Sequence, residues 1–338
     1  MIHKTHLVAN KDGWVLALKQ TYDPRKLRRD LRPIAIVPGY GMNAFIFGYH
    51  PTGKSMEAYW ADKGFEVWSL NLRAQDGSRA VGGSRHYGFY EAGVTDLNCA
   101  LEYVVQETVT RAERVDGVGC SLGGTYLYIY MAWMGGESRL GSVAALGAPL
   151  RWTNIHPALK AVFSSPFLLG RLRVRGTRQL ARIVLPILRR TIPKALHLYM
   201  HPEIVDTSKI GEMVKTVEDP NPVLNLQIGE WIRSGDLYVR GVNVSQGVAK
   251  AENPLLIVLA NADGIVPEAA ALSARELITS TVKDVLRVGT EQIKVAHADL
   301  FVSEISQKWV FDPLADWLLR QNRSPRVIRT VKNQAALS

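Results

Sequence analysis

Cysteine is scarce in this sequence, which contains only Cys99 and Cys120 among its 338 residues. Two cysteines cannot supply the disulfide framework of a small secreted protein. The first twenty residues also lack the continuous apolar segment of a signal peptide. Together these absences predict a reduced, cytoplasmic protein.

Long apolar runs, low-complexity tracts and internal repeats are missing as well. A membrane-spanning helix needs about 20 apolar residues, and the best candidate, residues 126–134, is far shorter. Hydrophobic residues nevertheless make up 47% of the chain, and charged residues only 21%. We therefore expect a folded chain with a substantial buried core and no transmembrane segment.

Acidic residues are fewer than basic ones. The chain has 31 Asp and Glu against 41 Lys and Arg, which gives a formal net charge of +10. The excess is local, because residues 151–250 contain fifteen basic and seven acidic side chains. The rest of the chain is nearly neutral. A charge confined to one segment does not indicate a nucleic-acid-binding fold, so we expect no nucleic-acid partner.

Short apolar runs alternate with helix-like segments along most of the chain. This alternation predicts an α/β protein with a mostly parallel sheet and helices on both faces. Near the N-terminus, Asp12 and Gly13 lie between two alternating runs and predict an antiparallel hairpin. The expected buried strands are residues 33–38, 65–72, 114–120, 142–148, 254–260 and 284–289, and the expected helices are residues 55–62, 95–109, 122–134, 268–277 and 309–320.

The alternation stops between residues 151 and 250, where basic helix-like stretches and turn clusters replace it. We interpret this block as an inserted helical cap on a core formed by residues 1–150 and 251–321. Residues 322–338 have no apolar period and are expected to be a flexible tail. Residues 160–194 hold nine basic side chains, no acidic one and many apolar ones. Peripheral contact with an anionic membrane is one interpretation, and an apolar face packed on the core, with arginines in water, is the one we favour.

The segment GVGCSLGG places a cysteine and a serine side by side between glycines. Read in register, residues 119–123 spell GxSxG, in which the central residue sits on a strained corner between a strand and a helix. Gly119 and Gly123 then avoid side-chain collisions on either side. Cys120 would be central only if residue 118 were glycine, and it is Val118. The candidate nucleophile is Ser121.

A serine nucleophile needs a base, and the base needs an acid that fixes its tautomer. The expected chain order is Ser, then Asp or Glu, then His. Asp263 follows the strand 254–260, and His297 follows the strand 284–289. Open α/β sheets bind ligands at these carboxyl strand ends. Asp299 could compete as the acid, but we prefer Asp263, because a neighbour so close to His297 more naturally caps the following helix.

A carbonyl under attack develops negative charge, so hydrogen-bond donors must face it. The backbone amide of Leu122, directly after the nucleophile, is one expected donor. The other should come from PGYGMNAF after the strand 33–38, where Gly39 and Gly41 allow close approach and the amide of Tyr40 is the best placed. A simple glycine turn is an equal alternative for this loop.

These residues resemble the α/β-hydrolase fold superfamily, in its lipase, esterase and polyhydroxyalkanoate synthase-like branches. PGYG is similar to the family's oxyanion loop, GCSLGG to its nucleophile elbow, and DGIVP and HADLF to its acid and base loops, over about residues 12–150 and 250–320. Pro38 replaces the histidine that usually opens the oxyanion loop. The synthase branch usually has a cysteine nucleophile, which is displaced here by one position. The resemblance implies ester or thioester chemistry without a metal or organic cofactor.

His197 and His201 lie four residues apart, as in the zinc motif HExxH, but the glutamate is missing. Two exposed or core histidines are the favoured interpretation. Cys99 lies among apolar residues of a predicted helix and is expected in the core, as is Cys120.

Three functional hypotheses remain. The first is a serine hydrolase that cleaves small or lipid-like carboxylic esters through Ser121, His297 and Asp263. The second is an acyltransferase or polyester synthase that passes the same acyl-enzyme to another acceptor. The third is a catalytically silent binding module with this fold, whose altered loop at Pro38 no longer stabilises an oxyanion. Oligomeric state is not indicated by the sequence.

Overall fold

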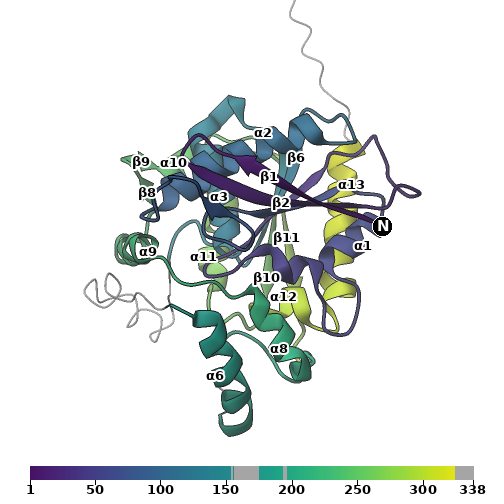
Figure 1. Ribbon diagram of the computed structural model, residues 1–338, viewed down its shortest axis with the longest axis vertical. Helices are drawn as coiled ribbons and strands as arrows, with labels where there is room; N and C mark the ends of the chain where they lie inside the picture. The colour runs from purple at the N-terminus through teal and green to yellow at the C-terminus, as the bar shows by residue number, and fades with distance from the viewer. Residues whose placement is uncertain (154, 156–174, 193–195, 324–338) are drawn as a thin grey trace, which may run out of the picture.

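A computed structural model describes residues 1–153, 155, 175–192 and 196–323. A nine-stranded sheet runs through the molecule in the order β1-β2-β4-β3-β6-β7-β10-β11, with β5 paired to β2 (Figure 1). The strands are β1 (Ile2–Ala9), β2 (Trp14–Tyr22), β3 (Ile34–Val37), β4 (Val67–Asn71), β5 (Arg79–Ala80), β6 (Val115–Cys120), β7 (Leu140–Leu146), β10 (Leu255–Ala260) and β11 (Lys283–Val288).

The sheet begins antiparallel and continues parallel, as the sequence predicts. β1 and β2 form the expected hairpin, and β2 pairs antiparallel with β4. From β4 to β11 every neighbouring pair is parallel. Val37 of β3 lies opposite Gly119 of β6, and Cys120 lies opposite Leu146 of β7. The carboxyl ends of β3, β6 and β7 therefore lie side by side at the same edge of the sheet.

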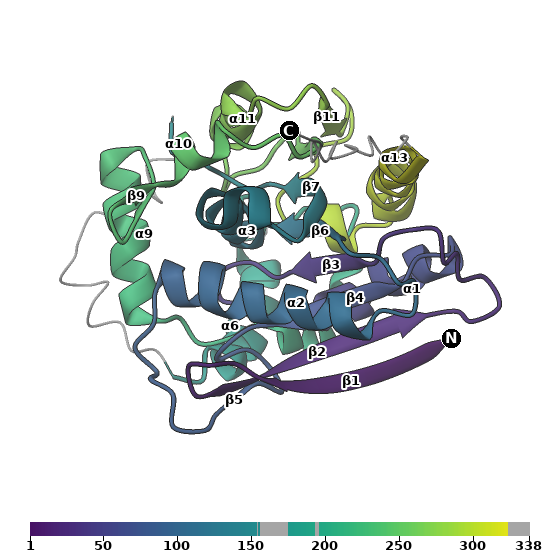
Figure 2. The same cartoon turned by 90° about the horizontal axis from the view of Figure 1, so that it is seen from above.

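Helices cover both faces of the sheet (Figure 2). Because side chains alternate along a strand, Ala35 and Val37 enter the core beneath one set of helices, whereas Ile34 and Ile36 enter the core beneath the other. On the first face lie η2, a π-helix (Glu91–Asp96), α2 (Leu97–Glu107), α3 (Leu122–Met134) and α11 (Glu268–Leu277); on the second lie α1 (Met56–Asp62), α12 (Asp299–Val302), the π-helix η6 (Gln307–Phe311) and α13 (Asp312–Arg323).

The chain between β7 and β10, which we call the β7–β10 segment, adds no strand to the main sheet among its described residues. It does contain a two-stranded ribbon, where the sequence showed no clear strand. Its last helix, α10, packs on α3 of the core, where Gly247 lies so close to Ala132 that a side chain would overlap. The elements are α6 (Thr177–Thr191), η4 (Thr207–Lys209), α8 (Ile210–Met213), η5 (Val214–Thr216), α9 (Pro222–Ser234), β8 (Tyr238–Val239), β9 (Val242–Asn243) and α10 (Val244–Val248).

Two further expectations differ from the structure. The tail was expected from residue 322, but α13 continues through Arg323, and the remainder, residues 324–338, lies outside the described residues. Cys99 is half-buried at the margin of the core rather than inside it, and its thiol lies 3.7 Å from the carbonyl oxygen of Ala9. The remaining short 3-10 helices are η1 (Ala44–Gly48) and η3 (Gly135–Glu137).

A buried carboxylate explains why β6 tolerates an aspartate in its centre. Asp116 is completely buried and accepts hydrogen bonds from Arg32 Nε at 2.7 Å and from Ser142 Oγ at 2.8 Å. Its other oxygen accepts one from Asn322 Nδ2 at 2.8 Å. The side chain thus connects β6 to β7, to the entry of β3 and to the end of α13.

Asp116→Ala should therefore destabilise the protein by about 3 kcal/mol, because it leaves three donors of the core without their acceptor. Ser142→Ala removes only one of the three hydrogen bonds to this carboxylate and keeps the ion pair with Arg32, so it should cost about 1.5 kcal/mol. Urea unfolding followed by tryptophan fluorescence measures both. Equal losses for the two variants would contradict the role assigned to Asp116.

Candidate active site

Ser121 occupies the turn between β6 and α3 in a strained backbone conformation. Its φ is +54° and its ψ is −125°, which non-glycine residues adopt rarely. The Ser121 amide is held by the carbonyl of Leu146 at 2.8 Å. This geometry lifts the hydroxyl away from both the strand and the helix, towards the carboxyl edge of the sheet.

Glycines make this turn possible, as the GxSxG spacing predicts. A side chain on Gly119 would overlap the backbone of Gly124, and one on Gly123 would overlap the carbonyl of Val37 at the end of β3. Cys120, by contrast, is completely buried, and burial raises the pKa of its thiol well above the usual value. Cys120 therefore stays a protonated core residue, whereas Ser121 faces a cavity.

His297 and Asp263 are joined by a hydrogen bond of 2.7 Å between Nδ1 and Oδ2. Both side chains are almost fully buried, with 6% and 4% of their surfaces exposed. The other carboxylate oxygen of Asp263 accepts hydrogen bonds from the amides of Ile265 and Val266, each at 2.9 Å. The acid is thus held by its own loop, and it in turn fixes one ring nitrogen of the histidine.

Gly147, directly after β7, lies against this pair. It has a φ of +54°, and a Cβ there would lie 2.9 Å from His297 Cε1 and 3.2 Å from Asp263 Oδ2. The absence of a side chain at residue 147 leaves the space that the imidazole and the carboxylate occupy. Gly147 was not among the predicted site residues, although its position near the end of the predicted strand 142–148 was a usable signal.

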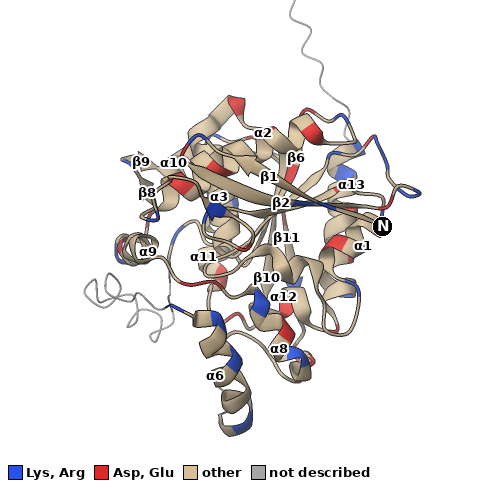
Figure 3. Cartoon of the chain, in the orientation of Figure 1, with Lys and Arg blue, Asp and Glu red and all other residues tan. Residues whose placement is uncertain are grey.

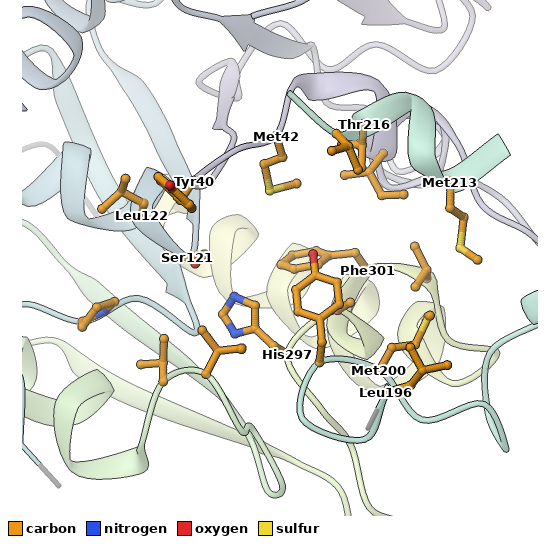
Figure 4. A pocket seen from close by; sticks show the side chains of 18 of the residues that line it. Tyr40, Met42, Ser121, Leu122, Leu196, Met200, Met213, Thr216, His297 and Phe301 are labelled. Carbon is orange, nitrogen blue, oxygen red and sulfur yellow. The ribbon is translucent and has the colours of Figure 1, made fainter. Parts of the chain in front are cut away.

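His297 also faces Ser121. In Figure 4 the imidazole points towards the serine, and both side chains border the same cavity. Among the described residues, no hydrogen bond involves the Ser121 hydroxyl. The structure thus brings the three predicted residues, from chain positions 121, 263 and 297, to one place at the carboxyl edge of the sheet.

Asp299 has a different role from the one expected. It does not cap the following helix, whose N-cap is Ala298 and has no side-chain hydrogen bond. Its buried carboxylate instead accepts hydrogen bonds from the amide of Ala296 at 2.7 Å and from the amide and Nδ1 of His201, each at 3.0 Å. The expectation was wrong because the main partner, His201, is 98 residues away in the sequence.

The loop after β3 lies directly on the serine turn. A Cβ on Gly39 would lie 2.9 Å from the Cys120 carbonyl and 3.0 Å from Ser121 Cβ, so only glycine permits this approach. The phenol of Tyr40 donates a hydrogen bond to Asn225 of α9, and Gly41 adopts a φ of +61°. Among the described residues, the amide of Tyr40 donates no backbone hydrogen bond.

A cavity of about 530 Å³ opens next to Ser121 and His297. Its walls are almost entirely apolar and come from both the core and the β7–β10 segment. Figure 4 shows it extending from the serine, past Met42 and Phe301, towards Met213, Met200 and Leu196. This volume is in the range of small-molecule sites.

The β7–β10 segment is joined to the loops of the site along two lines of contact, which we call the seams. At the first seam, Tyr199 accepts a hydrogen bond from the amide of Ala298 at 2.8 Å, and a Cβ on Gly264 would lie 2.6 Å from the Leu198 carbonyl. His201 adds its bonds to Asp299 there.

The second seam joins the loop after β3. Thr216 accepts a hydrogen bond from the amide of Asn43, and the amide of Glu218 donates one to Gly41, both at 2.8 Å. Asn43 Nδ2 also donates to the Lys215 carbonyl at 3.0 Å.

His197 and His201, which lie four residues apart, have separate carboxylate partners. The rings of His197 and His201 lie 4.8 Å apart, but His197 pairs with Glu203 and His201 with Asp299. In the described part of the chain, no group of three or more His, Cys, Asp or Glu side chains could hold a metal ion. Nor does any helix in those residues have the length and apolar character needed to cross a bilayer.

Comparison with known proteins gives similarity in structure alone. No protein-family model matches the chain, and no curated protein does. Among solved structures, it is similar to a thermophilic esterase from Thermogutta terrifontis (TM-score 0.59, 15% identity, 95% of this chain and 100% of that one). It is also similar to a monoacylglycerol lipase from Paleococcus ferrophilus (TM-score 0.59, 15% identity, 90% of this chain and 99% of that one). A third similar structure is an enol-lactonase from Burkholderia xenovorans LB400 (TM-score 0.58, 13% identity, 94% of this chain and 99% of that one). These neighbours and the sheet order together show that the chain has the α/β-hydrolase fold.

Proposed function

We propose that this protein is a serine hydrolase that cleaves carboxylic esters with a lipid-like, apolar acyl or alcohol part. The observation that carries the proposal is the 2.7 Å hydrogen bond between His297 Nδ1 and Asp263, at the wall of the cavity that Ser121 also borders. A histidine fixed in this way presents its other nitrogen to the serine as a base. The fold neighbours described as an esterase, a lipase and a lactonase all act on ester bonds by name, which agrees with this chemistry.

The reaction begins when His297 Nε2 takes the proton of the Ser121 hydroxyl as Oγ attacks the ester carbonyl carbon. The carbonyl oxygen gains negative charge, and we assign its stabilisation to the backbone amides of Leu122 and Tyr40. Leu122 is the first residue of α3, so its amide is not used within the helix. The strained turn at Ser121 turns the serine towards the cavity, and the glycine at residue 39 lets the Tyr40 loop come close.

Collapse of the tetrahedral intermediate breaks the bond to the alcohol oxygen, which takes the proton from His297 and departs. A water molecule then gives a proton to His297 and attacks the acyl carbon. The second intermediate collapses, the bond between the acyl carbon and Ser121 Oγ breaks, and Oγ takes the proton from His297 as the acid leaves. Asp263 stabilises the charged imidazole in both halves. The hydrogen bond between serine and histidine commonly tightens only when substrate fills the site.

Pro38 departs from the usual histidine of the oxyanion loop, but the loop has other supports. The carbonyl of Pro38 lies 2.7 Å from where a Cβ on Gly123 would be, so the loop rests on the first turn of α3. The second seam, through Asn43 and Gly41, holds its far side. We propose that these contacts replace the missing histidine.

Ser121→Ala should abolish labelling by a fluorophosphonate probe and lower ester turnover by about 10⁴-fold or more, because no other group can form the acyl-enzyme. Gel fluorescence and nitrophenyl ester hydrolysis measure the two effects, and Cys120→Ala is the matched control, which should keep both. Equal labelling of wild type and Ser121→Ala would overturn the assignment. If the wild-type protein hydrolyses no ester, the binding-module hypothesis is favoured instead. If it transfers more acyl groups to an added alcohol than it releases as free acid, the protein is an acyltransferase.

Gly147→Ala should lower ester turnover by about tenfold or more, since the new methyl group displaces the imidazole or its carboxylate partner. Gly135→Ala is the matched control, because Gly135 has a similar φ of +51° but open space around it. Both variants carry the backbone cost of about 1 kcal/mol that a side chain meets at positive φ. Turnover that falls equally in the two variants would show that backbone strain, rather than crowding of His297, is responsible.

Met213→Trp should shift the preference towards short acyl chains. Met213 lies at the end of the cavity away from Ser121 (Figure 4), so a larger side chain shortens the space for a long chain without touching the reacting atoms. We expect kcat/KM for decanoyl esters to fall by about tenfold relative to acetyl esters. Met213→Leu, which keeps the volume, is the control. An unchanged chain-length profile would mean that the acyl chain does not extend towards Met213.

A further inference from the structure

Helix α6 has an apolar face that no described part of the protein covers. Leu180, Ile183 and Ile187 are 53%, 63% and 54% exposed, and Ile192, just beyond the helix, is 57% exposed. Residues three, four and seven apart lie on one side of a helix, so these three aliphatic side chains form one stripe. Figure 1 shows α6 projecting from the body of the molecule.

The other side of α6 is attached to the protein. Helix α6 packs on α8 and η5, Ala181 and Leu185 contact the core on the second face of the sheet, and Leu185 also lines the cavity. The N-terminus of the helix is held by Asp219, whose carboxylate accepts hydrogen bonds from the amides of Gly176 and Thr177. The helix is therefore fixed in place with its second apolar face outward, so the exposure does not come from a detached segment.

The charge on this helix has one sign. Residues 175–192 contain five arginines and no acidic residue, and Figure 3 shows only basic colouring on α6. Arg178 is paired with Glu218 at 3.0 Å, whereas the side chains of Arg182 and Arg190 are exposed and have no carboxylate partner among the described residues. Two unpaired arginines thus lie on the same helix as the exposed stripe.

We propose that α6 docks the protein on an anionic lipid surface, with Leu180, Ile183 and Ile187 between the acyl chains and Arg182 and Arg190 at the headgroups. An amphipathic helix with a basic polar face and modest overall hydrophobicity lies in the plane of such an interface. With 15 residues, α6 is about 22 Å long and too short to cross the apolar part of a bilayer. A second copy of the chain fits this face less well, because it would place two basic helices against each other.

Docking of this kind would bring the cavity to the lipid surface, because Leu185 of the same helix forms part of its wall. Binding itself needs no catalysis. Ser121→Ala should therefore bind vesicles as the wild type does, so a failure of the proposed hydrolysis and a failure of docking are separate results.

Flotation with vesicles tests the proposal. The full chain should bind vesicles of phosphatidylcholine mixed with phosphatidylglycerol, and bind phosphatidylcholine alone far more weakly. Arg182→Gln with Arg190→Gln should weaken binding to the mixed vesicles by about 30-fold, on the basis of about tenfold or less for each arginine near the surface. Ile183→Ser with Ile187→Ser should weaken binding by about 100-fold, because it removes the apolar anchor.

The matched control variants change exposed residues outside α6. Val81→Ser with Tyr238→Ser removes similarly exposed apolar groups, which are 54% and 60% exposed, and Lys4→Gln with Arg25→Gln removes two exposed charges. Both controls should bind as the wild type does. Circular dichroism and hydrolysis of a short soluble ester should be unchanged in every α6 variant, since none of the four side chains lines the cavity.

Three results would overturn the proposal. Wild type that does not float with mixed vesicles rules it out, and so does binding that the α6 variants and the controls lower equally. Sedimentation equilibrium provides the third. A dimer of the wild type that becomes a monomer in Ile183→Ser with Ile187→Ser would show that a second copy, rather than lipid, covers the stripe.

Discussion

The geometry of the site depends on one close contact between two backbones. The start of α3 packs on the end of β3 so tightly that Gly123 leaves no room for a side chain beside the Val37 carbonyl. This contact fixes the helix N-terminus at the level of the carboxyl strand ends, and the turn before it must then take up the positive φ seen at Ser121. The turn keeps its strained conformation because the buried central strands on either side hold it in place. In these strands Val37, Gly119 and Leu146 lie at nearly one level.

The same constraint explains why much of the candidate site could be predicted from the sequence. The central strands are buried on both faces, so they appear as short continuous apolar runs, and the glycines around Ser121 mark a turn that few other residues could form. Asp263 and His297 were identified because their loops follow the last two such runs. Chain order and strand ends were sufficient for these residues, since parallel strands end at a common edge.

Contacts between distant segments could not be predicted in this way. Asp299 was expected to act within its own loop, yet its carboxylate serves His201 from the β7–β10 segment. Asn225, which accepts the Tyr40 phenol, and Leu185, which lines the cavity, lie in the region where the alternation of strand and helix stops. A local hydrophobic period cannot predict a partner that lies 98 or 185 residues away in the sequence. Asp116 is a similar case, because its low strand propensity is offset by three donors from separate elements.

The two seams change how the β7–β10 segment should be regarded. A lid in the simple sense is attached at its ends and moves as a unit. Here Tyr199 and His201 are hydrogen-bonded to the loop that carries His297, and Thr216 accepts a hydrogen bond from the loop after β3. The segment therefore braces the loops on both sides of the serine. A chimaera that received this segment from another α/β-hydrolase would need matching residues at both seams, because a mismatch at either one would alter the walls of the site as well as its specificity.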